Sequence, residues 1–226
     1  MVPIAARSTR GTAPLSAYPK AVVIMAEGPA PENVRVFIAI AVPDLIKEQI
    51  KTTQDRLCTG FNRRSVRWTN PDHFHLTLRF LGRVEAGSVA SLVDTLRTVC
   101  QSVRPLQLRA KGVGFFPSSR APRVIWVGVH ESEERLASFQ QTVQRASLGF
   151  TSEPAEERFS GHITLGRTKR LSRNETTTLA RTAERYSGTT FGEWRAHEVH
   201  VMRSQLSAVG AVHSLLAAVP LCADSD

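Results

Sequence analysis

Two short segments of this sequence share the pattern His-x-Thr-Leu. The first reads HLTL from His75 and the second reads HITL from His162. Both lie in runs of apolar and β-branched residues that predict β-strands. Because side chains two residues apart on a strand point to the same face, each motif presents an imidazole beside a hydroxyl, from Thr77 or Thr164. The leucine and isoleucine positions then point to the opposite face and predict a core.

Two such motifs fit a reaction at phosphorus. The pKa of histidine lies near neutrality, so a neutral and a protonated imidazole can act as general base and general acid. Displacement at phosphorus suits this pair, because the nucleophile and the leaving group lie on opposite sides of the phosphorus atom. The hydroxyls of Thr77 and Thr164 can donate hydrogen bonds to the non-bridging oxygens. The residues alone leave open whether His75 or His162 is the acid.

The segments that must position both motifs predict strands alternating with helices from Val34 onward. Two strands separated by a turn at Asn70-Pro71-Asp72 are expected within residues 66–82, and a helix follows them. The other expected strands are residues 34–43, 106–116, 123–129, 162–167, 193–204 and 212–221, and the other expected helices are residues 43–57, 132–149 and 172–186. This alternation in two comparable halves predicts an α+β fold of sheet and helices, built from duplicated β-α-β units.

The first 33 residues differ from the rest of the chain. They are rich in Ala, Pro, Ser and Gly, and their one apolar island, AVVIMA, is too short for the core of a signal peptide. We interpret residues 1–33 as a disordered N-terminal extension and residues 34–226 as a single domain. Since Met25 precedes the domain, translation could also begin there.

Composition indicates an ordinary globular protein with a basic surface. Hydrophobic residues make up 42% of the chain and charged residues 22%, and no apolar run is long enough to span a bilayer, so we expect no membrane partner. A formal charge of +9 would attract phosphates or nucleic acid, although a solvated Arg-rich surface is the alternative. The three cysteines lack a CxxC spacing, which favours a reducing cytoplasm.

Other patterns with possible chemistry are weaker. DHFH at 72–75 offers an H-x-H pair, but no cluster of further metal ligands follows it. HEVH at 197–200 is not H-E-x-x-H and lies in a strand-like run, which favours polar strand positions. The sequence contains neither a Walker loop nor a Gly-rich dinucleotide fingerprint. We therefore expect neither a metal nor a cofactor, and ATP-driven ligation is unsupported.

The two motifs and their surroundings resemble the two-histidine (2H) phosphoesterases, which carry two H-x-[TS]-x motifs on central strands. The similarity is greatest to the branch of RNA 2′,3′-cyclic phosphodiesterases, also called the LigT-like or 2′-5′ RNA ligase family, and it extends from about Val34 to the C-terminus. Besides the motifs, it rests on segments in the family's order, at residues 34–43, 66–82, 116–129, 159–167 and 201–221. The resemblance implies a bilobal fold of duplicated ferredoxin-like units with a central groove, and catalysis without metal.

The resemblance also implies a role for each motif residue. His75 would be the proton donor to the departing 3′-oxygen, and His162 the proton acceptor that activates water. Thr77, Thr164 and Arg167 would bind the substrate phosphate. The substrate would be RNA with a 2′,3′-cyclic phosphate end, the product a 2′-phosphomonoester, and any 2′-5′ ligation the reverse reaction.

Two arginines near the motifs have opposite strand parity. Strict alternation from His162 would turn Arg167 away from the motif face, and Gly166 permits the bend that would bring it back. Arg79 has the correct parity from His75, although surface charge is the alternative for both arginines. We prefer Arg167 as the phosphate contact.

Three positions depart from the family's usual pattern. Gly161 precedes His162 where proline is usual, Gly166 precedes the arginine where alanine is usual, and His213 stands where tyrosine is common. Phe80 and Trp126 could stack on bases, but aromatic residues in strands more often belong to the core.

Two further functions remain as alternatives. One is a phosphodiesterase acting on small cyclic nucleotides or 2′,5′-linked oligonucleotides. The other is a non-catalytic RNA-binding domain that uses the histidines only as polar contacts. The intact His and Thr of both motifs argue against the second alternative, because a degenerate binder is expected to lose at least one of them. We expect the protein to be a monomer.

Overall fold

The structure is a computed structural model that describes residues 32–59, 61, 65–207 and 210–223. The disordered extension predicted for residues 1–33 lies outside them, apart from its last two residues. The strands are β1 (Asn33–Ala41), β2 (Val66–Trp68), β3 (His75–Glu85), β4 (Leu106–Phe116), β5 (Val124–Glu131), β6 (His162–Thr168), β7 (Thr190–Ala196), β8 (Glu198–Ser207) and β9 (Gly210–Pro220). The α-helices are α1 (Asp44–Cys58), α2 (Val89–Cys100), α3 (Arg135–Ala146) and α4 (Arg173–Glu184), and short 3₁₀-helices are η1 (Pro71–His73), η2 (Ala86–Ser88) and η3 (Leu148–Phe150).

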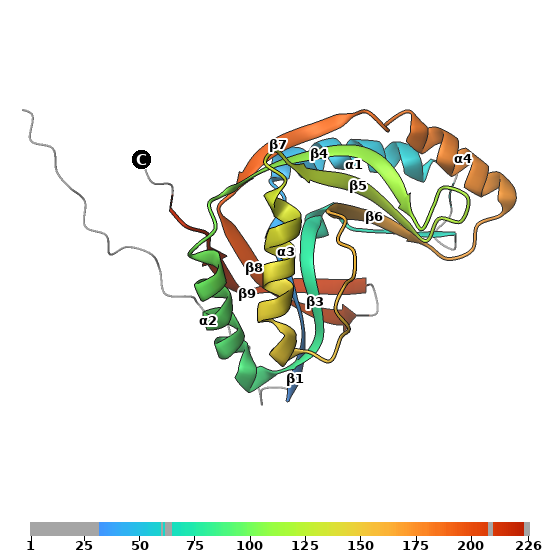
Figure 1. Ribbon diagram of the computed structural model, residues 1–226. Coiled ribbons are helices and arrows are strands. Elements are labelled where there is room, and N and C mark those ends of the chain that lie inside the picture. Colours follow the sequence, from blue (N-terminus) through green and yellow to red (C-terminus); the bar gives the residue numbers. More distant parts are fainter. Residues whose placement is uncertain (1–31, 60, 62–64, 208–209, 224–226) are drawn as a thin grey trace, which may run out of the picture.

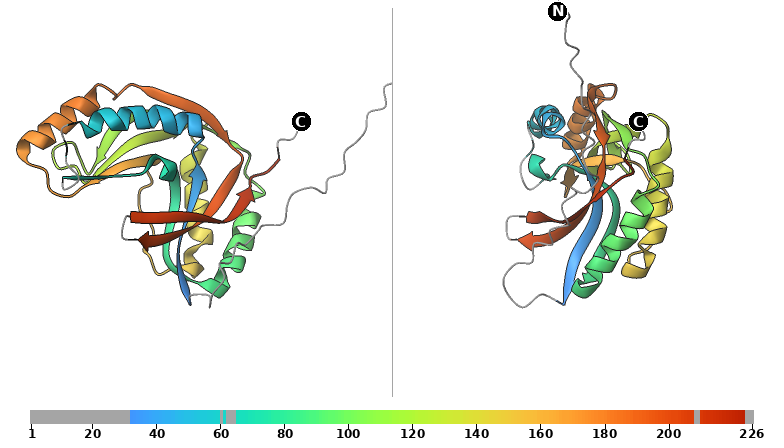
Figure 2. Two further views of the ribbon diagram at one scale, coloured as in Figure 1. Left: turned by 180° about the vertical axis from the view of Figure 1, so that it is seen from behind. Right: turned by 90° about the vertical axis from the view of Figure 1, so that its left-hand side faces the viewer.

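All described strands belong to one curled antiparallel sheet, in the order β7-β4-β5-β6-β3-β1-β8-β9, with β2 added beside β6. The sheet divides into two lobes (Figures 1 and 2). The middle lobe contains β4 to β7 together with β2. The terminal lobe contains β1, β3, β8 and β9, so it is built from both ends of the domain. The predicted α+β, bilobal fold is therefore confirmed, with one difference: the lobes are not successive halves of the sequence.

Two helices pack on the lobe to which their preceding strand does not belong. Helix α1 follows β1 of the terminal lobe, yet it packs on β7 and α4 of the middle lobe. Helix α3 follows β5 of the middle lobe, yet it packs beside α2 on β3 of the terminal lobe (Figure 1). Among the described helices, none has the length and apolar character needed to cross a membrane.

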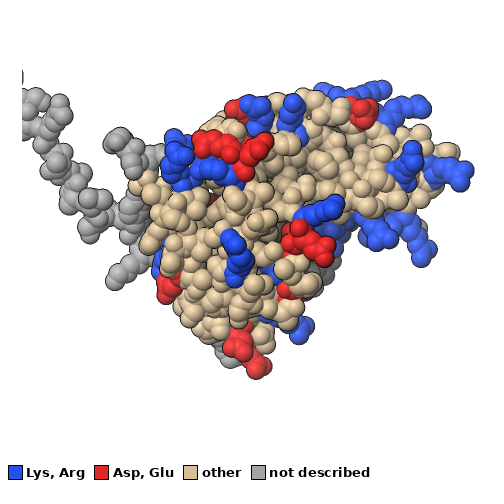
Figure 3. Space-filling view, in the orientation of Figure 1, with Lys and Arg blue, Asp and Glu red and all other residues tan. Residues whose placement is uncertain are grey.

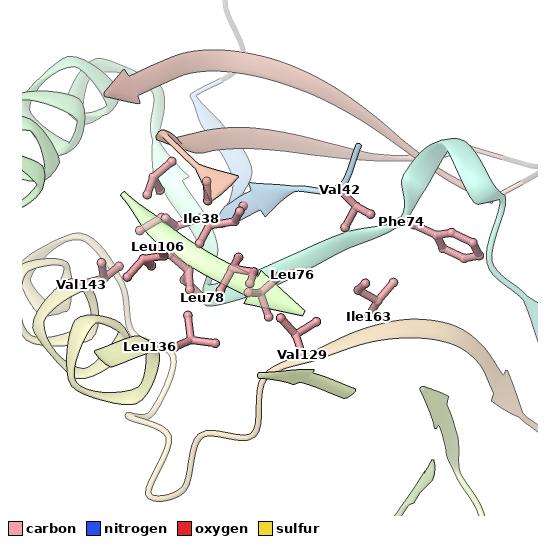
Figure 4. Packing of buried hydrophobic residues seen from close by; sticks show 14 of the residues in the cluster. Ile38, Val42, Phe74, Leu76, Leu78, Leu106, Val129, Leu136, Val143 and Ile163 are labelled. Carbon is pink, nitrogen blue, oxygen red and sulfur yellow. The ribbon is translucent and has the colours of Figure 1, made fainter. Parts of the chain in front are cut away.

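A single hydrophobic cluster lies between the curled sheet and its helices. Figure 4 shows Leu76 and Leu78 of β3 packed with Ile38 of β1 and with Leu106 of β4. Apolar residues on alternating strand positions supply this cluster, as the period of the pattern predicted. The polar side chains of the two motifs lie on the opposite face of β3 and β6.

The prediction that Arg79 shares the face of His75 is wrong. The register of β3 against β1 shifts between Thr77 and Arg79, which is a β-bulge at Leu78. Arg79 consequently turns to the core side, where it is only 2% exposed.

Arg79 ties the segment before β6 to the terminal lobe. Its guanidinium donates hydrogen bonds to the carbonyl oxygens of Glu153 and Pro154, each at 2.7 Å, and to Oε1 of Gln144 at 3.3 Å. These acceptors lie on α3 and on the loop that leads to His162. Arg79, which belongs to β3, therefore helps to position β6, the strand of the second motif.

Replacing Arg79 with methionine should reduce the free energy of unfolding by about 3 kcal/mol, because two part-buried carbonyl oxygens and the buried Oε1 of Gln144 would lose a charged donor. Urea denaturation followed by circular dichroism measures the change. Arg83→Met, at an exposed position on the same strand, is the matched control and should change stability by less than about 0.5 kcal/mol. Equal effects of the two substitutions would contradict the anchoring role of Arg79.

Candidate active site

The two motif strands meet at the junction of the lobes. The pairing between β3 and β6 places Leu76 opposite Ile163. Both side chains are fully buried, at 0% exposure, and point into the core shown in Figure 4. The strand pairing that joins the lobes therefore lies at the apolar position inside each His-x-Thr-Leu motif.

This register brings the four polar motif residues together on the other face. In an antiparallel pair, the residues flanking one matched pair face each other in turn. His75 therefore lies across from Thr164, and Thr77 lies across from His162. All four side chains are half-buried. Each imidazole therefore has two threonine hydroxyls as neighbours, one on its own strand and one directly across on the other strand.

A second β-bulge, in β6, brings Arg167 to this face. The register of β6 against β5 shifts between Thr164 and Gly166, so Leu165 is the extra residue. Leu165 and Gly166 are both buried, and Arg167 turns back to the side of Thr164. A Cβ at residue 166 would approach the ring of Trp68 to 2.9 Å, so glycine fits this bend where a larger residue would not.

The bulges in β3 and β6 occupy equivalent places. Each follows the motif threonine, and each returns the residue five positions after the histidine to the polar face. That residue is Phe80 in β3 and Arg167 in β6, and both line the same pocket. The two half-sites therefore match at the His and Thr positions and differ at the next residue on the polar face.

The pocket on this face has a volume of about 570 Å³, a size usual for small-molecule sites. It contains three of the four motif side chains and Arg167. The residues that line it are Phe37, Arg67, Trp68, Thr69, Asn70, His73, His75, Thr77, Phe80, Thr164, Arg167, Ser204, Ala211, Val212 and His213.

His162 lies beside this pocket, outside its lining. Its ring packs edge-on against Phe116, with ring centroids 5.0 Å apart. Burial is the main cause that lowers the pKa of both motif histidines; beyond it, positive charge on His162 contributes to the lowered pKa of His75, and the charge of Arg167 contributes to that of His162. His162 is thus electrostatically coupled to both sides of the pocket.

Both motif imidazoles are oriented in the same way. Nδ1 of His75 lies 2.7 Å from the carbonyl oxygen of His73, and Nδ1 of His162 lies 2.8 Å from that of Ser160. A carbonyl oxygen can only accept, so Nδ1 carries the proton and donates it in each hydrogen bond. Nε2 of each neutral ring therefore keeps a lone pair for a reacting group.

Burial favours the neutral form of both histidines. The pKa of His75 is lowered to about 4, against an ordinary value of 6.5, mainly by desolvation and to a smaller extent by positive charge on His213, His73 and His162. The hydrogen bond to the carbonyl of His73 acts in the opposite direction. The pKa of His162 is also lowered, first by burial, while Glu156 partly offsets this effect. A bound anion would raise both pKa values.

Sequence reasoning missed several residues of this pocket. His213 packs against His73 at a ring distance of 4.7 Å and against His75 at 5.5 Å, so a third and a fourth imidazole surround the first motif histidine. Arg67 lies on β2 opposite Arg167. The unusual histidine at 213 was the one signal in the sequence, and the role of Arg67 depends on a long-range strand pairing.

The weaker candidate motifs do not form metal sites in the part of the chain that the structure describes. No group of three or more His, Cys, Asp or Glu side chains is placed there to hold a metal ion. In the HEVH segment, Nε2 of His200 lies 2.7 Å from the carboxylate of Glu198 on strand β8. This pair is a polar surface contact, as expected for the segment. Trp126 packs against Phe116 and does not line the pocket.

Sequence comparison identifies relatives of this chain. The sequence pattern of the LigT like phosphoesterase family matches residues 40–126. The RNA 2′,3′-cyclic phosphodiesterase of Archaeoglobus fulgidus is 32% identical over 182 residues, which are 79% of this chain and 96% of the relative. That of Methanocaldococcus jannaschii is 27% identical over 183 residues, which are 80% of this chain and 98% of the relative.

Solved structures share the fold. TT0787 of Thermus thermophilus superimposes with a TM-score of 0.67 at 23% identity, covering 83% of this chain and 97% of that chain. LigT of E. coli, crystallised with 3′-AMP, gives a TM-score of 0.66 at 22% identity, covering 84% and 99%. These likenesses confirm the expected architecture. The match to the Archaeoglobus relative, which covers nearly all of that protein, shows the family to which this sequence belongs. The chain belongs to the LigT-like phosphoesterase family.

Proposed function

We propose that this protein hydrolyses 2′,3′-cyclic phosphate ends of RNA to 2′-phosphomonoesters. The observation that carries the proposal is the junction of β3 and β6, where two imidazoles and two hydroxyls converge on one face beside a pocket with an arginine. The names of the relatives, RNA 2′,3′-cyclic phosphodiesterases, supply the substrate class. A non-catalytic RNA-binding role is not favoured, because both motifs retain His and Thr.

Phosphate binding falls to three side chains in this proposal. The hydroxyls of Thr77 and Thr164, on opposing strands, donate to the non-bridging oxygens from two directions. Arg167 neutralises the charge that builds on these oxygens in the transition state. The pocket wall around them is partly apolar, which strengthens each of these interactions.

Proton transfer falls to the two imidazoles. Nε2 of His162 accepts a proton from water as the water oxygen attacks phosphorus. The bond from phosphorus to the 3′-oxygen breaks, and protonated His75 donates a proton to that oxygen. His75 is neutral in the free protein at neutral pH, and the anionic cyclic phosphate raises its pKa on binding. In 2′-5′ ligation a 5′-hydroxyl would take the place of water: His162 would accept its proton as its oxygen attacks phosphorus, and His75 would again protonate the departing 3′-oxygen.

We also propose a cytoplasmic monomer that acts without a metal. Free cysteines support the cytoplasmic location: Cys58, Cys100 and Cys222 are unpaired, and burial raises the pKa of Cys58 to about 11 and that of Cys100 to about 12. Thiols of this kind are typical of a reducing compartment. The pair of imidazoles supplies the proton transfers that a metal-bound water would otherwise need.

An RNA oligonucleotide ending in a 2′,3′-cyclic phosphate should be converted to the 2′-phosphate, with and without EDTA. Chromatography against authentic 2′- and 3′-phosphate standards identifies the isomer. Cyclic mononucleotides and 2′,5′-linked oligoadenylate, assayed in parallel, test the alternative substrates. A predominant 3′-phosphate product would contradict the proposed mechanism, and loss of activity on chelation with recovery on adding one metal would favour a metal-dependent hydrolase.

His75→Ala and His162→Ala should each lower kcat by roughly 10²–10⁴-fold, because each removes a positioned acid or base. Thr77→Ala and Thr164→Ala should cost about 1.5–3 kcal/mol of transition-state stabilisation each, the value of one hydrogen bond to a charged group. His130→Ala, at an exposed position of β5 outside the pocket, is the control and should retain activity.

A substrate with sulfur in place of the 3′-oxygen separates the two histidine roles, because a thiolate leaves without needing a proton. It should restore turnover to His75→Ala and not to His162→Ala. Rescue of His162→Ala instead would reverse the assignment, and rescue of neither variant would contradict acid–base catalysis by this pair.

Folding stability should fall as the pH drops from about 6.5 to about 4. In this window the unfolded chain binds a proton at residue 75 and the folded protein does not, so the unfolded state is favoured as protons become available. Over this window His75 accounts for a loss of roughly 3 kcal/mol in the free energy of unfolding. Urea titrations of wild type and His75→Gln at several pH values measure it: the variant should show the shallower pH dependence, and equal pH dependence would contradict a buried neutral His75.

A further inference from the structure

Two arginines face each other across strands at one end of the pocket. Arg67 of β2 pairs with Arg167 of β6, and both line the pocket. Like charges directly opposite on an antiparallel pair are destabilising. The ion pairs between described residues all lie elsewhere, so neither guanidinium is neutralised by a described carboxylate. An anion lying between them would relieve this repulsion.

The positive charge continues from this pair to the free end of the middle lobe. The backbone of Thr168, next to Arg167, donates a hydrogen bond to the carbonyl of Arg123 at 3.0 Å. Lys169 and Arg170 follow directly in the chain, and Arg120 lies in the same β4–β5 connection as Arg123. We refer to the surface formed by the exposed side chains of Arg120, Arg123, Lys169 and Arg170 as the basic tip.

Acidic residues are scarce at the basic tip. The sequence contains no Asp or Glu from 117 to 123 or from 158 to 174. The next carboxylate, Glu175, already accepts hydrogen bonds from the hydroxyl of Ser65 at 2.7 Å and from the backbone of Ser172 at 2.8 Å, and these lower its pKa. Figure 3 shows Lys and Arg gathered at this end of the molecule, over α4 and the ends of β4, β5 and β6.

We propose that the basic tip binds the phosphodiester backbone of single-stranded RNA just upstream of the nucleotide held in the pocket. The inference rests on the proposed function, which places the last phosphate between the motif histidines. Arg67 and Arg167 join pocket and tip, so the strand leaves the pocket along a continuous row of cations. Aromatic residues in the pocket, Trp68 and Phe80, suit an unpaired terminal base. The preferred substrate is then an oligonucleotide and not a cyclic mononucleotide.

A fourfold variant tests this surface: Arg120→Gln, Arg123→Gln, Lys169→Gln and Arg170→Gln. The matched control removes four exposed cations elsewhere: Arg83→Gln, Arg104→Gln, Arg109→Gln and Arg145→Gln. Both variants lose the same net charge. Two measurements are made on each: kcat/KM for a cyclic mononucleotide and for a cyclic-phosphate-ended RNA of about ten nucleotides, and fluorescence anisotropy with the same RNA ending in a 2′-phosphate.

The tip variant should lose roughly 10- to 100-fold in RNA affinity and in kcat/KM for the oligonucleotide at low salt, and keep its activity on the mononucleotide. Its plot of log affinity against log salt should be shallower by about 0.7 for each phosphate that the tip no longer neutralises. The control variant should behave as wild type in these assays. Equal losses in the two variants, or equal losses on the two substrates, would overturn the inference.

The binding measurement separates this inference from the proposed function. If wild type opens no cyclic phosphate but the tip variant still binds RNA more weakly, the proposed function fails and the docking surface stands. If wild type is active and the tip variant binds and reacts like wild type, the docking surface fails alone. Tip-dependent binding to phosphatidylserine vesicles without any tip-dependent RNA binding would assign this surface to a membrane and overturn the inference.

Discussion

The register between β3 and β6 is fixed where Leu76 lies opposite Ile163, and the positions of the four motif side chains follow from that pair. Both residues are completely buried. A slip of one residue would turn every side chain of a strand to its other face, which would place the imidazole and hydroxyl in the core and two large apolar groups in the pocket. The hydrophobic effect therefore sets the alignment of the polar motif side chains on the opposite face. Packing on the core face of β3 and β6 thus determines the geometry of the polar side chains on their other face.

The two bulges make the half-sites similar without making them identical. Each strand places two successive residues on the core side after its threonine and then turns outward again. In β3 the second of these residues is Arg79, which anchors the loop before β6, and the residue that turns outward is the aromatic Phe80. In β6 the second is Gly166, which accommodates the Trp68 ring, and the residue that turns outward is the cationic Arg167. A pair of imidazoles thus lies between an apolar side, at Phe80, and a charged side, at Arg167, which makes the two ends of the pocket chemically different.

Much of this arrangement follows from the sequence, because strand alternation is a local property. The parity of His75 with Thr77 and of His162 with Thr164 needs only the period of a β-strand, and the resemblance of the motif segments indicated the architecture. The side on which Arg79 lies could not be predicted in this way, since one extra residue in a ladder reverses the parity and depends on the partner strand. The imidazole of His213 beside His75 and the guanidinium of Arg67 beside Arg167 depend on pairings between distant segments. Position in the sequence carries little information about such contacts.

The terminal lobe is assembled from strands at both ends of the domain, and this has a consequence for biosynthesis. Strands β1 and β3 leave the ribosome early, but β8, which pairs with β1, begins only at Glu198. Until then, one edge of β1 has no partner, while the middle lobe already has all of its strands. The pairing of β1 with β8 closes a very long loop, a type of contact that slows folding. His213 on β9 is the last residue in chain order that lines the pocket, so the pocket is completed only after this strand has been synthesised. Until β8 arrives, an exposed strand edge needs protection against pairing with other chains.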